Sequence, residues 1–328
     1  MMGVFQMEIK EIKEEELNPE KFIEEKIEEI ISIVGDETAI NALSGGVDSS
    51  TVTMLGHKAL GDRLKTYFIE NGLMRSNEPQ QVVSLFKELG VHVEIIDAKD
   101  MFFKALKGIT DPEEKRDKGI TKTFYKEVFG KLVQEIGAKF LLQGTIYTDV
   151  EETVAGIKRQ HNVLEQLGID TEEQYGYKVI EPLIQLRKNT VRVVAKNLGL
   201  PESNYNRMPF PGPALAARVI GEVTPERIEI VRKATSIVEE ELANTDAFQY
   251  MAILHEDRVT GMRNGQREFG RQIEIRCWDS IDATVATPTK LTYEKLEILA
   301  DRITTEVPGV VSVTYNIAKK PPSTMEVV

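Results

Sequence analysis

The stretch Ala42-Leu43-Ser44-Gly45-Gly46-Val47-Asp48-Ser49-Ser50 is the most informative part of the sequence. It follows a short apolar run, residues 39–43, and opens a helical pattern that continues to residue 60 and ends at Gly61. Glycines let a backbone approach a ligand closely, and the first turn of a helix offers free N–H groups and the positive end of its dipole. The stretch therefore predicts an anion-binding loop between a buried strand and a helix.

Two other phosphate-binding motifs are absent, since neither GxxxxGKS/T nor GxGxxG occurs in the chain. The carboxylate of Asp48 needs an explanation of its own, because bound phosphates would repel it. A divalent cation held between Asp48 and the phosphates removes that repulsion. The alternative interpretation is an ordinary glycine-rich turn in which serine and aspartate cap the helix.

The rest of the chain indicates two domains. Short apolar strands alternate with helical patterns up to about residue 200, which predicts an α/β fold with a mostly parallel sheet and helices on both faces. The proline-rich stretch Met208-Pro209-Phe210-Pro211-Gly212-Pro213 suits neither a helix nor a central strand. We predict an acidic N-terminal arm over residues 1–18, a first domain over residues 19–205 and a smaller α+β domain over residues 206–328.

Composition narrows the classes of function. The net charge of −12 is opposite to the basic surplus typical of nucleic-acid binders. The single cysteine, Cys277, excludes a disulfide or a cysteine-rich zinc site within one chain. No apolar run approaches the roughly 20 residues of a membrane span, and the acidic start is unlike a signal peptide. We therefore expect a cytoplasmic protein that binds neither nucleic acid nor a membrane.

Several segments carry a family resemblance. SGGVDS, residues 44–49, resembles the pyrophosphate loop of the N-type ATP pyrophosphatases. Segments similar to GMP synthetase then follow in order: FIENGLMR (68–75), ITDPEEKR (109–116), QGTIYTDV (143–150), IKRQHNV (157–163), PFPGPALAAR (209–218), EVPG (306–309) and KPPSTME (320–326). From about residue 20 to the C-terminus, the chain resembles the ATP-pyrophosphatase subunit of GMP synthetase in its archaeal two-subunit form, or a close paralogue.

This resemblance implies that ATP adenylates the 2-oxygen of XMP, that ammonia attacks C2, and that AMP and GMP leave. It makes the first domain the ATP pyrophosphatase and the second the dimerisation and acceptor-binding domain. The implied residues are Ser44, Gly45, Gly46, Val47, Asp48, Ser49 and Ser50 for pyrophosphate, Asp48 for Mg²⁺, Ile69 and Phe124 for adenine, Lys115 for a phosphate, and Arg218, Lys320, Thr324 and Glu326 for XMP. Asp48, Ser49 and Lys115 are the implied catalytic residues.

Gly144 and Thr145 complete the predicted ATP site, because they follow a strand pattern at residues 140–143 and parallel sheets bind ligands at the C-terminal ends of their strands. The chain has no Cys–His–Glu glutaminase signature, so the resemblance implies a separate glutamine amidotransferase subunit as the ammonia source. It also implies a homodimer formed through the C-terminal domain. A lid over ATP is a further hypothesis for the charged segment 110–123.

The acceptor side departs from the family pattern. The family's residues at four positions are replaced by Glu70, Gln160, Met208 and Ala214. A paralogue that adenylates another phosphorylated carbonyl acceptor, for amidation or sulfur transfer, therefore stays open beside XMP amination. A tRNA thiolation enzyme is a third interpretation, which the single late cysteine and the negative charge disfavour.

Overall fold

The computed structural model describes residues 9–154, 176–281 and 283–327. They form two compact units, each of which is described by itself. The first comprises the described residues up to Ile69, Pro79–Asp97 and those within Phe124–Arg207. The second comprises Glu70–Glu78, Ala98–Thr123 and the described part of the chain from Met208 onward. The second unit is therefore discontinuous in sequence.

The first unit is built on a five-stranded sheet with the order β3-β2-β1-β4-β5. Its strands are β1 (Ala39–Ala42), β2 (Leu64–Glu70), β3 (Val93–Asp97), β4 (Phe140–Leu142) and β5 (Lys178–Ile180). Strand β1 pairs in parallel with β2 on one side and with β4 on the other, and β4 pairs in parallel with β5. The predicted α/β fold with a mostly parallel sheet is confirmed.

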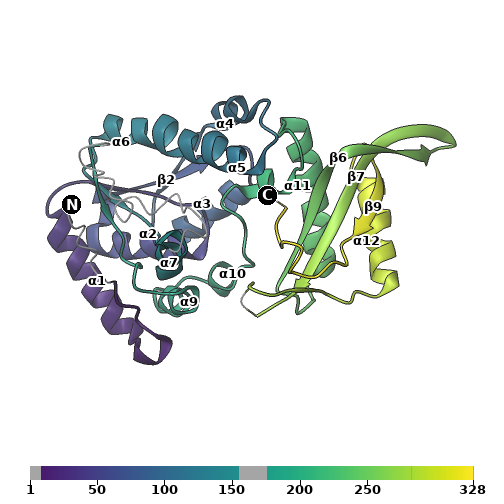
Figure 1. The fold of residues 1–328 in the computed structure, drawn as a ribbon. Coiled ribbons are helices and arrows are strands. Elements are labelled where there is room, and N and C mark those ends of the chain that lie inside the picture. The colour runs from purple at the N-terminus through teal and green to yellow at the C-terminus, as the bar shows by residue number, and fades with distance from the viewer. Residues whose placement is uncertain (1–8, 155–175, 282, 328) are drawn as a thin grey trace, which may run out of the picture. The chain divides into compact units, whose positions relative to one another are not determined.

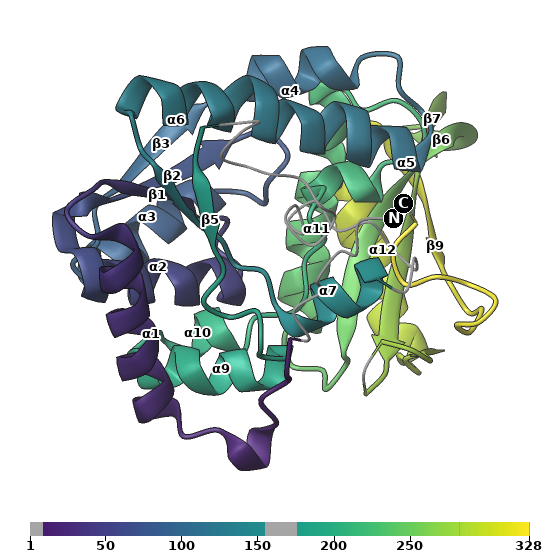
Figure 2. The same cartoon turned by 60° about the vertical axis from the view of Figure 1, so that its left-hand side comes forward.

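Helices cover both faces of this sheet. The helices of this part of the chain are α1 (Pro19–Val34), α2 (Val47–Leu60), α3 (Glu78–Glu88), α6 (Gly130–Ile136), α7 (Tyr147–Val154), α9 (Lys188–Asn197) and α10 (Glu202–Tyr205). Figure 2 shows α1, α2 and α9 on one side of the sheet and α6 on the other. Gly56 lets α2 lie close to the strands, because a Cβ there would come within 2.5 Å of Leu142 Cδ2 and 2.9 Å of Leu64 Cδ2.

Helix α1 shows how the sequence signals act locally. The side chain of Asn18 accepts a hydrogen bond from Lys21 N at 3.1 Å, and Pro19 occupies the first helical position, where no backbone donor is needed. The buried residues Phe22, Ile30 and Val34 form the inner face. Among the described residues, no helix has both the length and the apolar character to cross a bilayer.

The second unit contains a long antiparallel hairpin of β6 (Gln249–Arg263) and β7 (Gln266–Asp279), which Figure 1 shows running beyond α12. Strand β9 (Val310–Tyr315) pairs in parallel with β7, and β8 (Thr287–Pro288) is a short antiparallel addition. The apolar pattern of the sequence predicts strands only over residues 250–254 and 271–278, which are the parts of the hairpin away from its tip. Asn264 and Gly265 at the tip both have positive φ, as a tight two-residue hairpin turn requires.

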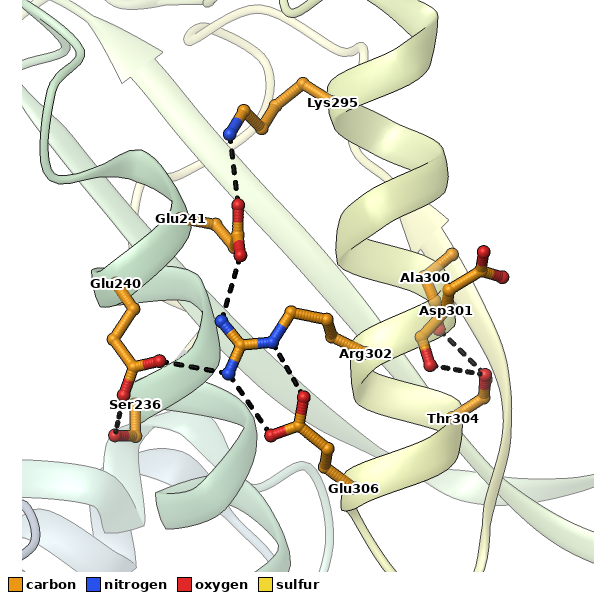
Figure 3. Close-up of polar contacts among 9 residues, drawn as sticks. All are labelled: Ser236, Glu240, Glu241, Lys295, Ala300, Asp301, Arg302, Thr304 and Glu306. Atoms are coloured by element: carbon orange, nitrogen blue, oxygen red, sulfur yellow. Dashed lines mark hydrogen bonds and ion pairs between the residues drawn. The ribbon is translucent and has the colours of Figure 1, made fainter.

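Two helices pack against this sheet, α11 (Pro225–Leu242) and α12 (Tyr293–Glu306). Arg302 of α12 ties them together, since its guanidinium donates to Glu241 at 2.9 Å, to Glu240 at 3.0 Å and to Glu306 at 2.7 Å (Figure 3). Lys295 donates to the second oxygen of Glu241 at 3.0 Å. These ion pairs fix the spacing of the helices along their exposed edges.

The segment that follows α4 (Lys99–Leu106) is helical: α5 (Pro112–Glu114) leads into π-helical turns at Lys115–Thr121 and Thr123–Phe129. The first π-helical turn packs on α4, where a Cβ on Gly119 would come within 2.5 Å of Leu106 Cδ2. A packed helix therefore occupies most of the segment for which the sequence suggested a lid.

Candidate functional site

The loop between β1 and α2 lies at the point where the strand order reverses. From β1 the chain continues to β2 and β3 on one side of the sheet, and then returns to add β4 and β5 on the other side of β1. Ligands of parallel sheets bind at such a point, beyond the C-terminal ends of the strands. Gly45 has a φ of +79°, which a glycine adopts without strain. Gly46 caps α2 without using a side chain, so the first N–H groups of the helix stay open to a ligand.

Two serines brace this loop. Ser49 Oγ donates to Gly46 O at 3.0 Å and accepts from Ser44 N at 3.2 Å. The two hydroxyl oxygens of Ser44 and Ser49 lie 2.9 Å apart, and Gly46 N donates weakly to Ser44 Oγ at 3.4 Å. A consistent set of donors has Ser49 bonded to the backbone and Ser44 bonded to Ser49. The predicted residues Ser44, Gly46 and Ser49 are thus brought together.

Asp48 contacts Lys188, which the sequence alone did not predict as part of the site. Its Oδ2 pairs with Lys188 Nζ, while its Oδ1 is buried with no hydrogen-bond partner in the described part of the chain. Lys188 is the first residue of α9, whose first turn contains no acid. Basic residues are unfavourable at a helix N-terminus. The adjacent pair Arg187-Lys188 before a helical pattern was therefore a usable signal.

Gly144 follows β4 and packs directly on the start of α2. A Cβ at this position would lie 3.1 Å from both Asp48 C and Ser49 N. The neighbouring Thr145 is buried and donates to Glu181 Oε1 at 2.5 Å. The predicted position of Gly144 beside the loop therefore has a packing reason, and Glu181 is a further polar residue near the end of β5.

The two predicted adenine contacts belong to the first unit. Ile69 is buried near the end of β2, and Phe124 stacks on Phe129 with ring centroids 5.8 Å apart. Tyr125 packs edge-on against Phe124 at 4.9 Å, and burial raises its pKa, so the phenol stays protonated. The segment with Gln160 and His161 lies outside the described residues.

A second polar cluster lies in the second unit. Arg218 is fully buried, and its Nη2 is 3.3 Å from Glu326 Oε1, which also accepts from Gln249 Nε2 at 2.9 Å. Within the described residues, Arg218 Nε and Nη1 and Glu326 Oε2 are buried and have no partner. The Arg218 guanidinium lies 4.8 Å from the Phe210 ring centroid, and that of Arg75 lies 3.8 Å from it. Buried unpaired donors are costly, so this cluster suits a polar ligand.

The C-terminal segment that carries Glu326 is held on the sheet. Arg276 donates to Thr324 O at 2.7 Å and to Met325 O at 3.2 Å, while its Nε bonds Glu274 at 2.6 Å. The Met325 side chain is buried in an apolar cluster with Met251, Ile253, Trp278 and Ala286. Of the other predicted acceptor residues, Lys320 donates to Ala283 O at 2.7 Å and Thr324 Oγ1 donates to Glu326 O at 2.5 Å.

Lys115 belongs to the second unit and is buried there. Its Nζ donates to Val219 O at 2.8 Å, next to Arg218 in sequence. Burial, followed by the charge of Arg227, lowers the Lys115 pKa from 10.5 to about 8, and Glu256 and Asp111 oppose the shift. Its predicted contact with a phosphate stays a prediction.

The loop at the switch point of a parallel sheet places the first unit in the class of α/β proteins that bind an anion at a helix N-terminus. The NAD synthase family model matches residues 19–131, and the model of the GMP synthase C terminal domain matches residues 236–327.

Relatives match almost the whole chain, and each is one subunit of a glutamine-hydrolyzing GMP synthase. That of Pyrococcus furiosus is 49% identical over 94% of this chain and 97% of its own length. The relative from Archaeoglobus fulgidus is 50% identical over 94% of this chain and 99% of its own. The relative from Methanocaldococcus jannaschii is 45% identical over 94% of this chain and 99% of its own. The chain belongs to this family of GMP synthase subunits.

Proposed function

We propose that this chain is a C–N bond-forming ligase that aminates XMP to GMP at the expense of ATP. The XMP 2-oxygen attacks the α-phosphorus of ATP, the bond from that phosphorus to the bridging oxygen breaks, and pyrophosphate leaves. Ammonia then attacks C2, and the C2–O bond breaks. AMP leaves with that oxygen and a proton is released. The relatives that share about half of the residues over 94% of the chain support this assignment.

The loop of the first unit is suited to the phosphates. The open N–H groups at the start of α2 supply donors to phosphate oxygens, the hydroxyls of Ser44 and Ser49 hold the loop in place, and Lys188 supplies a positive charge beside it. Such fixed donors and charges stabilise the negative charge that moves onto pyrophosphate as the bond breaks. Ile69 and Phe124 offer apolar surfaces to the adenine ring.

A magnesium ion fits these residues. Mg²⁺ is commonly held by one or two carboxylates together with substrate phosphates, and Asp48 Oδ1 is a buried oxygen without a partner in the described part of the chain. Asp48 is therefore the residue proposed to hold it. The ion would supply positive charge to the phosphate oxygens and would offset the repulsion between them and Asp48.

The observation that carries the acceptor assignment is the buried cluster of Arg218 and Glu326. Its unpaired guanidinium nitrogens suit a phosphate, and its unpaired carboxylate oxygen suits a ribose hydroxyl or a base N–H. Lys320 and Thr324 lie on the same C-terminal segment as Glu326 and extend the proposed XMP site.

Two partners belong to the proposal. The relatives are named as one subunit of a glutamine-hydrolyzing enzyme, which supports a separate glutaminase subunit that supplies ammonia. A homodimer through the second unit is supported by the exposed face of the β6–β7 hairpin. There the Met262 and Phe269 residues are 69% and 63% exposed.

The test mixes the purified chain with ATP, Mg²⁺, ammonium and XMP and separates the nucleotide products. Equal amounts of AMP and GMP that depend on XMP are expected. ATP binding without XMP-dependent AMP would contradict the proposal and favour a different phosphorylated acceptor. Arg218→Lys should raise the KM for XMP and leave that for ATP unchanged, since lysine lacks the two-pronged donor geometry.

A further inference from the structure

Asn204 is a buried amide that contacts both ends of the phosphate loop. It lies on the short helix α10, and its Nδ2 is 3.1 Å from Ser50 Oγ and 3.4 Å from Gly45 O. A carbonyl oxygen can only accept, so the contact with Gly45 fixes which end of the amide is the nitrogen. The side chain of Asn204 therefore bonds to the loop rather than to its own helix.

The contact with Gly45, a weak one at 3.4 Å, favours one orientation of the peptide group that follows. In a trans peptide the C=O and the following N–H point in opposite directions. Since Gly45 O is turned toward Asn204, the N–H of Gly46 is turned to the other side, where it donates to Ser44 Oγ at the long distance of 3.4 Å. Gly45 has a φ of +79° and no side chain, so little else in the residue resists a flip of this peptide.

The contact with Ser50 acts in the same direction. Ser50 Oγ accepts the hydrogen bond from Asn204, so the hydroxyl hydrogen is free to point to another acceptor. The Ser50 side chain is completely buried, and its N–H donates to Gly46 O at 2.9 Å. Asn204 thus links the buried start of α2 to the loop, while the N–H of Gly46 faces away from it.

We infer that Asn204 is a positioning residue for ATP: it holds the Gly45–Gly46 peptide and the buried Ser50 side chain at the start of α2, so that the Gly46 N–H donates to the pyrophosphate part of the nucleotide. The inference rests on the proposed function, because it takes ATP to be the ligand of the loop. Asn204 touches no reacting atom and acts only through these two groups.

Two variants test this role. Asn204→Ala deletes the amide, and Asn204→Asp keeps its shape but replaces the donor by a carboxylate that repels phosphate and accepts from Ser50. We expect the dissociation constant for ATP to rise about tenfold in the first and about a hundredfold in the second, as the loss of one buried hydrogen bond and the addition of a repelling charge suggest. The KM for XMP should stay unchanged.

The control is Asn206→Ala. Asn206 lies two residues further along, is exposed, and donates to Glu202 at 3.0 Å without reaching the loop. ATP affinity and melting temperature should match those of the unaltered chain. Ser50→Ala adds a second check, because Asn204→Ala should weaken ATP binding less in that background than in the unaltered chain.

The outcomes separate the two proposals. An unchanged ATP dissociation constant in both Asn204 variants would overturn the inference, as would equal losses for ATP and XMP together with a lower melting temperature. If the unaltered chain binds ATP but does not turn over XMP, only the proposed function fails, and the ATP measurements still decide the role of Asn204. Failure of the unaltered chain to bind ATP would overturn both.

Discussion

The buried ammonium of Lys115 gives the second unit a pH-dependent stability. The Lys115 pKa falls from 10.5 to about 8 on folding, so between these values the unfolded chain binds a proton that the folded chain does not. The free energy of unfolding therefore rises with pH across this window. Below about pH 8 the full cost of burying the charge is present, about 3 kcal/mol for a shift of this size.

Lys115→Met removes the titrating group from the same buried position. The unaltered chain should gain about 2 kcal/mol relative to this variant when the pH is raised from about 7 to 9.5. The assay is urea unfolding followed by the fluorescence of Trp278, the single tryptophan of the chain, which is buried in the second unit. Comparison of the two chains at each pH cancels the titration of all other groups.

The matched control is Lys122→Met, which removes an exposed lysine seven residues further along the same helical stretch. Its pH profile should run parallel to that of the unaltered chain. The reasoning is refuted if the Lys115→Met profile is parallel as well. A profile that diverges in the opposite direction would mean that the folded unit stabilises the charged form of Lys115.

Three more changes probe other parts of the chain. Gly144→Ala puts a Cβ 3.1 Å from backbone atoms of Asp48 and Ser49, so the loop must shift. Steady-state assays should show a KM for ATP about tenfold higher. An unchanged KM would mean that the loop accommodates the methyl group without loss of ATP binding. Arg302→Met should lower the free energy of unfolding in urea by about 1 kcal/mol, and by less in 1 M salt, because the ion pairs of Arg302 are partly exposed. A loss of the same size at both salt concentrations would contradict this. Glu326→Gln leaves the Arg218 guanidinium without its carboxylate and should cost about 3 kcal/mol, whereas equal stability would show that the pair is dispensable.

Much of the fold could be predicted because its elements carry local signals. Helix α2 begins and ends where the sequence predicts, and the apolar period that follows Pro225 likewise predicts a helix over residues 225–242, which is α11. The outer half of the β6–β7 hairpin was missed because residues 256–263 are mostly exposed and polar, with no buried face to produce alternation. The Asn264-Gly265 pair at its tip is typical of a two-residue hairpin turn and was the available local signal.

The candidate site was predictable only where its residues are adjacent in sequence. The loop residues 44–50 form one motif, and their hydrogen bonds are local. Lys188 and Asn204 come to the loop from α9 and α10, about 140 to 160 residues away, so only the tertiary fold brings them there. For Lys188, the local signal was the basic pair Arg187-Lys188 at the start of α9. The pairing of Arg218 with Glu326 likewise spans 108 residues.

The discontinuity of the second unit affects how the chain is made. Residues 70–78 and 98–123 belong to it, yet the rest of the unit begins only at residue 208. A ribosome adds about 5 to 20 residues each second, so the second of these segments waits roughly 10 to 40 s for the end of the chain. During that time groups such as Lys115 Nζ, which donates to Val219 O in the finished protein, lack their partners. Because each unit is made of several segments of the sequence, dividing the chain at one position would leave neither unit intact. The two units must therefore be synthesised as one chain.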